Sequence, residues 1–146
     1  MSISKNIENI KILVVDDEKD MREFLRISLN GYGFKNTWEA EDGKVAFSLV
    51  KHQNFDLIIC DWRMPEMDGL ELLEAIRKLG NRKDTDFLMV TSVNDAKYVT
   101  TAIKSGVSGY ITKPVDIDTI YKKIVSIHEK KLEKLAASEP AWMSQR

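Results

Sequence analysis

Cysteine is nearly absent from this sequence of 146 residues, and Cys60 is its one representative. A single cysteine excludes a disulfide within the chain and a cysteine-rich zinc site. In an apolar segment it indicates a small buried side chain in a reducing compartment. No hydrophobic run approaches the roughly 18 residues of a membrane span, and residues 1–6 lack the apolar stretch of a secretion signal. We therefore expect a cytoplasmic protein without membrane insertion.

An excess of charge of either sign is also missing. The sequence has 22 Lys and Arg residues against 23 Asp and Glu, a net charge of −1. This balance lacks the electrostatic signature of a nucleic-acid binder or of a basic face for an anionic membrane. The hydrophobic fraction of 43% and the charged fraction of 31% are typical of a soluble globular protein. At this length we expect one folded domain, too small to include a second module such as a DNA-binding domain.

Short apolar runs alternate with segments of helical periodicity. Ile12 to Val15, Leu57 to Cys60 and Phe87 to Val90 predict strands buried on both faces, as in a parallel sheet. Weaker runs at 36–40 and 109–112 complete a set of five strands. The intervening apolar stripes predict helices at 21–29, 45–50, 70–77, 94–105 and 117–127, and the last stripe can be continued to Leu135.

Capping signals bound several of these helices. The sequence predicts that three helices stop at glycines, namely Gly31, Gly80 and Gly106, and that Asp116 is the N-cap of the last helix. The resulting alternation of strand and helix predicts an α/β protein, a doubly wound parallel sheet with helices on both faces. We expect one domain over residues 10–130, an N-terminal extension at 1–9 and a C-terminal helix extension and tail at 131–146. The tail contains Trp142, to which this prediction assigns no role.

Polar side chains follow four of the five predicted strands. Asp16 and Asp17 follow the first strand, Asp61 the third, Thr91 the fourth and Lys113 the fifth. Ligands of open parallel sheets bind beyond the carboxyl ends of the strands, so these side chains should meet at one edge. Each of them alone is typical of a turn, a helix cap or a solvated loop. Their joint position at strand ends favours a functional site.

The residue types of this set suit phosphoryl transfer. Clustered carboxylates repel one another, and a hard divalent cation such as Mg²⁺ relieves the repulsion. An aspartate can attack phosphorus and form an aspartyl phosphate. The transferred group carries charge on three equatorial oxygens, which a metal, a cation and a hydroxyl donor stabilise. Asp16 and Asp17 could hold the metal, while Lys113 and Thr91 could contact phosphoryl oxygens.

Four segments in this order resemble the receiver domain of two-component response regulators, and in particular its stand-alone chemotaxis members. The four segments are residues 12–18, 61–73, 88–91 and 109–114. The resemblance extends from about Ile10 to Ile127. It implies a flavodoxin-like (βα)5 fold in a single domain with strand order 2-1-3-4-5.

The resemblance also implies roles for individual residues. Asp61 would accept the phosphoryl group from a histidine kinase. Asp17, Asp61 and the backbone carbonyl of Arg63 would ligate Mg²⁺, with Asp16 acting through water. Thr91 and Lys113 would contact the phosphoryl oxygens.

A conformational switch is a further implication of the resemblance. Thr91 would move towards the phosphoryl group, and Tyr110 would rotate inward. The Lys113–Pro114 peptide bond would be cis. Arg63 and Val93 occupy positions that border the phosphoryl group in the family, and we hypothesise that they set the lifetime of the phosphorylated state.

The expected output is binding to another protein rather than catalysis on a substrate, by a protein that is a monomer. The target could be the flagellar motor switch or, in a phosphorelay, a histidine phosphotransfer protein. Two alternatives fit less well. A phosphatase with an aspartyl-phosphate intermediate commonly has a second Asp where this sequence has Arg63, and a flavodoxin-like redox carrier needs a phosphate-binding loop where it has Asp16 and Asp17.

Overall fold

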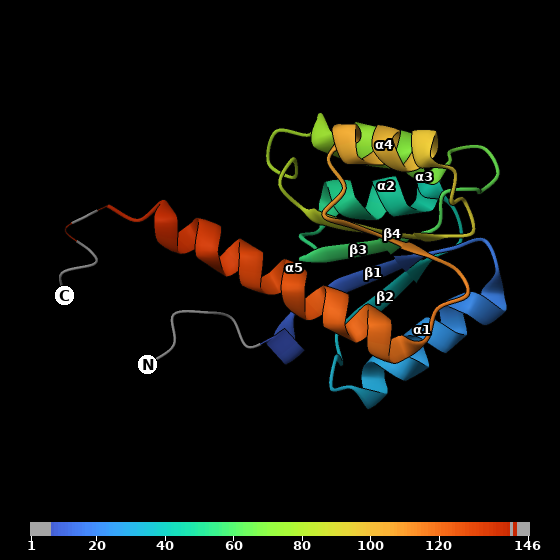
Figure 1. The fold of residues 1–146 in the computed structure, drawn as a ribbon, viewed down its shortest axis with the longest axis horizontal. Helices are drawn as coiled ribbons and strands as arrows, with labels where there is room; N and C mark the ends of the chain where they lie inside the picture. Colours follow the sequence, from blue (N-terminus) through green and yellow to red (C-terminus); the bar gives the residue numbers. More distant parts are fainter. Residues whose placement is uncertain (1–6, 141, 143–146) are drawn as a thin grey trace.

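A computed structural model describes residues 7–140 and 142 as five parallel strands and five α-helices that alternate along the chain (Figure 1). The strands are β1 (Ile12–Val15), β2 (Thr37–Ala40), β3 (Leu57–Cys60), β4 (Asp86–Thr91) and β5 (Gly109–Thr112). The helices are α1 (Lys19–Gly31), α2 (Gly43–His52), α3 (Gly69–Arg77), α4 (Ala96–Ser105) and α5 (Ile117–Ala137), and a short 3-10 helix, η1 (Ile7–Asn9), precedes β1.

The strand order is β2-β1-β3-β4-β5, which confirms the predicted doubly wound sheet. Every residue of β1 and β3 is buried, because these strands pair on both edges and are covered on both faces. The edge strands β2 and β5 are partly exposed. The continuous apolar runs of the sequence therefore correspond to the centre of the sheet.

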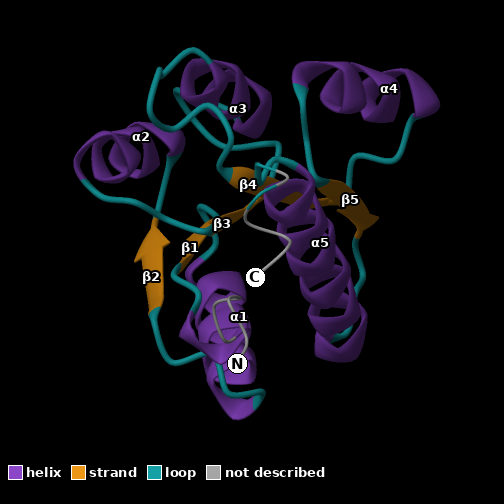
Figure 2. Cartoon of the chain, turned by 90° about the vertical axis from the view of Figure 1, so that its left-hand side faces the viewer, coloured by secondary structure: helices purple, strands orange, loops and turns teal. Residues whose placement is uncertain are grey.

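Two layers of helices cover the sheet (Figure 2). Alternate strand residues point to opposite faces, so Leu13 and Ile58 pack on the side of α2, α3 and α4. Ile12 and Ile59 pack on the other side, under α1 and α5. Each face thus has its own apolar core.

Aspartate side chains cap four of the five helices and set their starts. Asp42, Asp68, Asp95 and Asp116 each accept a backbone N–H from the first turn of the helix that follows. The prediction for Asp116 is confirmed. The helix expected from residue 94 begins at Ala96, because Asp95 caps it.

Two predicted glycine stops lie elsewhere than expected. Gly31 is the last residue of α1 rather than the residue after it. Helix α3 ends at Arg77, three residues before Gly80, because the chain tightens into turns in which Lys78 and Leu79 donate to carbonyls three residues back. Gly106 caps α4 as predicted, with a φ of 100°.

Helix α5 is the longest element, with 21 residues, and its second half extends past the sheet (Figure 1). Its buried residues Ile120, Ile124 and Ile127 lie in the first half. Leu135, near its end, is 57% exposed. In the described part of the chain, no helix combines the length and hydrophobicity that crossing a bilayer requires.

Candidate functional site

Strand register brings Asp16 and Asp61 side by side at the carboxyl end of the sheet. Val15 on β1 pairs with Cys60 on β3, so the residues that follow them, Asp16 and Asp61, leave the sheet at the same level. The Asp61 N–H donates to the Val15 carbonyl at 3.0 Å and holds the two strand ends together. Asp16 is 2% exposed and Asp61 9% exposed. Two carboxylates therefore meet at one edge of the sheet, as predicted from the strand ends, and both are largely buried.

Lys113 lies between these two carboxylates. Its Nζ is 3.2 Å from Asp16 Oδ2 and 3.4 Å from Asp61 Oδ2. Burial alone would lower the pKa of Lys113, but the charges of Asp16 and Asp61 outweigh it and the pKa is raised. The Lys113–Pro114 peptide bond is cis, as predicted. The site thus holds one permanent cation against two acids.

Burial also raises the pKa of Asp16. The Glu18 backbone N–H, which donates to Asp16 Oδ1 at 2.9 Å, and the charge of Lys113 act in the opposite direction, while the charge of Asp61 adds to the rise. The surroundings of Asp16 therefore disfavour its charged form on balance. A bound cation would stabilise that form.

Carboxylate oxygens of Asp16, Glu18 and Asp61 all lie within 4.8 Å of one another. Asp17, the residue expected to ligate a metal, is exposed and is not part of this group. Asp17 and Glu18 are both exposed, but a carboxylate oxygen of Glu18 lies near those of Asp16 and Asp61. The sequence motif contains Glu18, but strand–helix alternation alone does not predict which of three consecutive acids turns inward.

Thr91 and Tyr110 are placed on the opposite side of the acidic group from β1. Thr91 ends β4, is 1% exposed, and its Oγ1 accepts the Val93 N–H at 3.3 Å. Tyr110 on β5 donates its hydroxyl to the Val93 carbonyl at 2.5 Å. Burial, with the charge of Asp61 in addition, raises the pKa of the Tyr110 phenol. The Tyr110 side chain therefore lies inward in this structure, bonded to the loop after β4.

Arg63 and Val93, the two residues expected to border a phosphoryl group, differ in exposure. Arg63 is exposed, and its side chain makes no hydrogen bond or ion pair with the described residues. Val93 is buried and packs in the core on the α2, α3 and α4 side of the sheet. The polar member of this pair is thus the exposed one.

Gly69 allows the loop after β3 to pack closely against the backbone of Asp61. A Cβ at this position would lie 2.3 Å from the Asp61 carbonyl oxygen, and the Gly69 N–H donates to the Trp62 carbonyl at 2.7 Å. The sequence predicts a tight turn here. The structure shows that the reason for glycine is the close approach of two backbone segments.

An aromatic chain leads from the acidic group to the surface. The Trp62 backbone N–H donates to Asp61 Oδ1 at 2.7 Å. The Trp62 ring meets Tyr98 of α4 edge-on with centroids 5.6 Å apart, and Tyr110 with centroids 6.4 Å apart. Trp62 is buried, while Tyr98 is 38% exposed. Sequence reasoning did not identify Tyr98, because its partner is 36 residues away and on another element.

These contacts define the chemistry that the site supports. Asp61 is an aspartate with one oxygen near a lysine, one near a backbone N–H, and a hydroxyl residue on the next strand. The acids are oxygen donors of the type that Mg²⁺ prefers. Such a set can accept a group whose charge is spread over several oxygens.

The response regulator receiver domain model matches residues 12–125. The chain is 39% identical over 123 residues to chemotaxis protein CheY-3 of Vibrio cholerae, which covers 84% of this chain and 95% of that protein. It is 39% identical over 121 residues to chemotaxis protein CheY of Pseudomonas aeruginosa, covering 83% and 98%. A solved CheY-like receiver domain protein from Methanospirillum hungatei superimposes with a TM-score of 0.80 at 25% identity, covering 86% and 98%.

Proposed function

Because this chain belongs to the response regulator receiver domain family, we propose that Asp61 accepts a phosphoryl group from a histidine kinase. The observation that carries the proposal is the position of Asp61 Oδ2 beside Lys113 Nζ, at 3.4 Å, with Asp16 on the other side of the same ammonium. In the proposed state change, phosphorylation shifts the protein between two arrangements, and a partner protein binds one of them.

In the transfer step, an Asp61 carboxylate oxygen forms a bond to phosphorus while the phosphorus–nitrogen bond of the kinase phosphohistidine breaks. The electron pair of that bond leaves with the imidazole. Lys113 can pair with one equatorial oxygen, because its Nζ already lies near the attacking carboxylate. Thr91 can donate its hydroxyl proton to another oxygen, since its Oγ1 accepts the Val93 N–H and leaves the O–H free of that bond.

The acidic group suits Mg²⁺ as its cofactor. Asp16, Glu18 and Asp61 offer three oxygen ligands within 4.8 Å of one another, and hard oxygens with open positions match this ion. When bound, the ion would neutralise the carboxylates and polarise phosphoryl oxygens. The ligand roles of Asp17 and the Arg63 carbonyl are predictions from the resemblance. Comparing the Mg²⁺ affinity of Asp17→Asn with that of Glu18→Gln tests which of the two neighbouring acids takes part.

Chemotaxis is the process that we propose for this switch. The two relatives at 39% identity are named chemotaxis proteins. A cytoplasmic monomer that binds a component of the flagellar motor switch when phosphorylated fits this setting. In that state Thr91 and Tyr110 would report the phosphoryl group to α4 and β5. Transfer onward to a histidine phosphotransfer protein stays a prediction, because no observation favours it over the chemotaxis role.

The lifetime of the phosphorylated state is proposed to depend on Arg63 and Val93. An apolar Val93 cannot orient a water for hydrolysis, and the unpaired Arg63 can reach or shield a phosphoryl group. The double exchange Arg63→Asn and Val93→Glu should change the dephosphorylation rate. An unchanged rate would contradict this role.

The deciding experiment incubates the protein with a small phosphodonor and Mg²⁺ and measures the intact mass. Wild type should gain one phosphoryl group, and Asp61→Asn should gain none. Asp84→Asn, which removes an exposed acid far from the site, is the matched control and should be labelled like wild type. Equal labelling of wild type and Asp61→Asn would remove Asp61 as the acceptor.

A further inference from the structure

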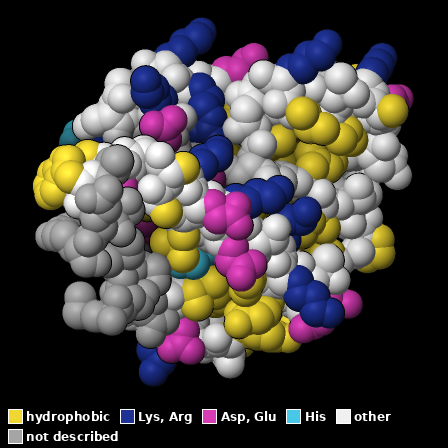
Figure 3. All heavy atoms as spheres, turned by 60° about the vertical axis from the view of Figure 1, so that its left-hand side comes forward, with side chains coloured by type: hydrophobic (Ala, Val, Ile, Leu, Met, Phe, Trp, Pro, Cys, Tyr) yellow, Lys and Arg dark blue, Asp and Glu magenta, His cyan; other side chains and the backbone are white. Residues whose placement is uncertain are grey.

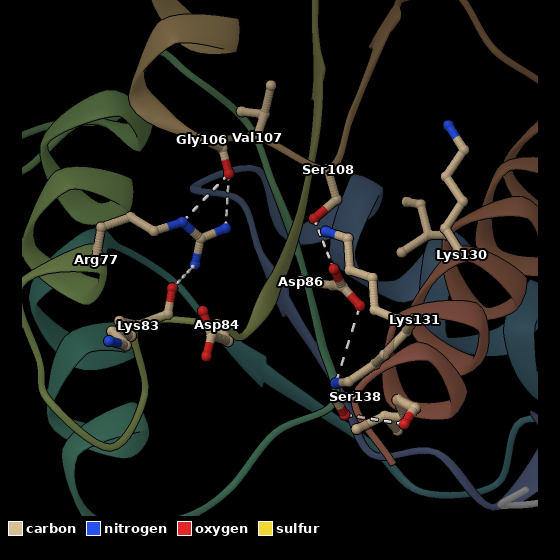
Figure 4. Close-up of a pocket in the computed structure, with 13 residues that line it drawn as sticks. Arg77, Lys83, Asp84, Asp86, Gly106, Val107, Ser108, Lys130, Lys131 and Ser138 are labelled. Carbon is tan, nitrogen blue, oxygen red and sulfur yellow. Dashed lines mark hydrogen bonds and ion pairs between the residues drawn. The ribbon is translucent and has the colours of Figure 1, made fainter. Parts of the chain in front are cut away.

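A hollow lies at the amino end of the sheet, opposite the acidic group. It is a cavity of about 730 Å³ between the end of α3, the start of β4, the segment after α4 and the second half of α5 (Figure 4). Its lining includes more cations than acids, namely Arg77, Lys83, Lys130, Lys131 and Lys134 against Asp84 and Asp86. The chain as a whole has a net charge of −1, so this end is locally basic. Figure 3 turns this side towards the viewer and shows Lys and Arg side chains near its middle, with Asp and Glu side chains beside them.

The structural partners of the lining residues leave positive charge available. Arg77 is held by backbone carbonyls, donating to Thr85 at 2.6 Å and to Gly106 at 2.7 Å. Asp86 is engaged by the Ser108 hydroxyl at 2.8 Å and, at 3.9 Å, by Lys131. Asp86 is therefore already engaged, and the Arg77 guanidinium, which also feels the charges of Asp86 and Asp84, is held in the wall by backbone carbonyls.

Three lysines of the cavity make no ion pair with the residues that the structure describes. They are Lys83 on the loop before β4, and Lys130 and Lys134 on α5. All three are exposed, and in Figure 4 the Lys130 ammonium is drawn away from the acids of the site. Lysine binds phosphate as a mobile point charge, so such side chains can close on an anion from several directions.

The cavity also has an apolar side and a continuation. Val107, Ile127 and Leu135 line it. Two smaller hollows, of about 290 Å³ and 80 Å³, adjoin it, and Lys131 lines all three. The main cavity alone is within the range of roughly 300–1,000 Å³ that small-molecule sites occupy.

We propose that this cavity binds a small organic polyphosphate of nucleotide size. Its phosphate groups would contact Lys130 and Lys134, one turn apart on α5, and its organic part would pack on Val107 and Leu135. The net positive lining excludes a metal cation as the occupant, and the apolar side distinguishes the site from one for a bare inorganic anion. The inference does not depend on the role of Asp61.

Calorimetric titration with ATP at low ionic strength, with EDTA to remove divalent ions, tests the proposal. Wild type should bind ATP, and inorganic triphosphate should bind more weakly because it has no organic part. The double variant Lys130→Ala/Lys134→Ala should weaken ATP binding by about tenfold or more, the loss expected for two phosphate contacts. Added salt should weaken it further, because exposed charges are screened.

The matched control is Lys19→Ala/Lys35→Ala, which removes two exposed lysines elsewhere on the surface and should bind ATP like wild type. Far-ultraviolet circular dichroism shows whether each variant is folded. Asp61→Asn should also bind ATP like wild type, so failure of this site and failure of the proposed acceptor are distinguishable. The proposal is overturned if millimolar ATP gives no binding, or if the Lys130/Lys134 variant binds as tightly as wild type. Equal affinity for ATP and triphosphate would overturn the role of the apolar side.

Discussion

The two ends of the sheet handle charge in opposite ways. At the carboxyl end, Asp16 and Asp61 are buried and share one ammonium, Lys113, at 3.2 and 3.4 Å. At the amino end, the lysines of the cavity are mostly exposed, and among the described residues only Lys131 approaches an acid, at 3.9 Å. The comparison shows that a net charge of −1 can conceal an acidic end and a basic end in one domain.

Burial decides how strongly each end responds to change. Charges are weakly screened inside a protein and strongly screened at its surface. A substitution beside Asp61 should therefore act through both charge and packing. A substitution at the amino end should act mainly through the contact that is lost.

Lys113→Ala should have the largest effect. It removes the cation beside Asp61, and losing one preorganised charge-stabilising donor slows such reactions by about 100- to 1,000-fold. The rate of phosphorylation by a small phosphodonor, followed by intact mass, measures the loss. Lys78→Ala, which removes an exposed lysine at the end of α3, is the control and should retain the wild-type rate. A Lys113→Ala rate within a few fold of wild type would contradict the role of Lys113.

Gly69→Ala should rank second. The new methyl group would lie 2.3 Å from the Asp61 carbonyl oxygen, so the loop must shift, at a cost of about 3 kcal/mol in unfolding free energy. Chemical denaturation measures that cost, and phosphorylation should slow as well because Asp61 moves. Gly80→Ala is the control from the opposite end, where nothing lies within 4 Å of the added atom. Equal stability of the two variants would show that the carboxyl end is not the more tightly packed.

Arg77→Met should lower the unfolding free energy by about 2 kcal/mol, because it leaves the carbonyls of Thr85 and Gly106 without a charged donor. Phosphorylation of Asp61 should not change, since Arg77 lies at the amino end. Denaturation and mass measurements on one preparation separate the two results. Slower phosphorylation in a folded Arg77→Met variant would mean that the two ends are coupled.

Glu39→Gln should have the smallest effect and depend on pH. Hydrogen bonds from Arg22 and Arg26 lower the pKa of Glu39 below its ordinary value of 4.5. The folded state therefore gains stability from the carboxylate above pH 4.5 and loses it as the pH falls through the lowered pKa. The difference between wild type and Glu39→Gln should be about 1 kcal/mol or less at neutral pH, as for partly exposed ion pairs. Denaturation at a series of pH values should show it vanish in acid, and a constant difference would contradict the assignment.

The features that the sequence predicted are those in which one strand or one helix carries the signal. The central strands β1 and β3 were evident because a strand covered on both faces is a continuous apolar run. Asp16, Asp61, Thr91 and Lys113 were predictable as a group, because parallel strands end at one edge. Helix ends were misplaced by one to three residues, since local caps and turns fix them.

The features that the sequence did not predict depend on contacts between distant segments. Glu18 reaches the acidic group while Asp17 faces solvent, and this depends on how the chain leaves β1. The basic cavity is lined by Arg77, Lys83 and Lys130, which lie on different elements. The net charge of the whole chain gives no sign of this local excess of cations. Both features become visible only in the three-dimensional structure.

The edge-on contact between Trp62 and Tyr98 has a thermodynamic consequence. The backbone N–H of Trp62 donates a hydrogen bond to Asp61, and Tyr98 presents part of its ring on the outside of α4. If phosphorylation of Asp61 changes the affinity of a partner protein that binds at Tyr98, linkage requires binding of that partner to change the phosphorylation equilibrium of Asp61 by the same factor. A partner protein bound to α4 would therefore also change the fraction of Asp61 that is phosphorylated.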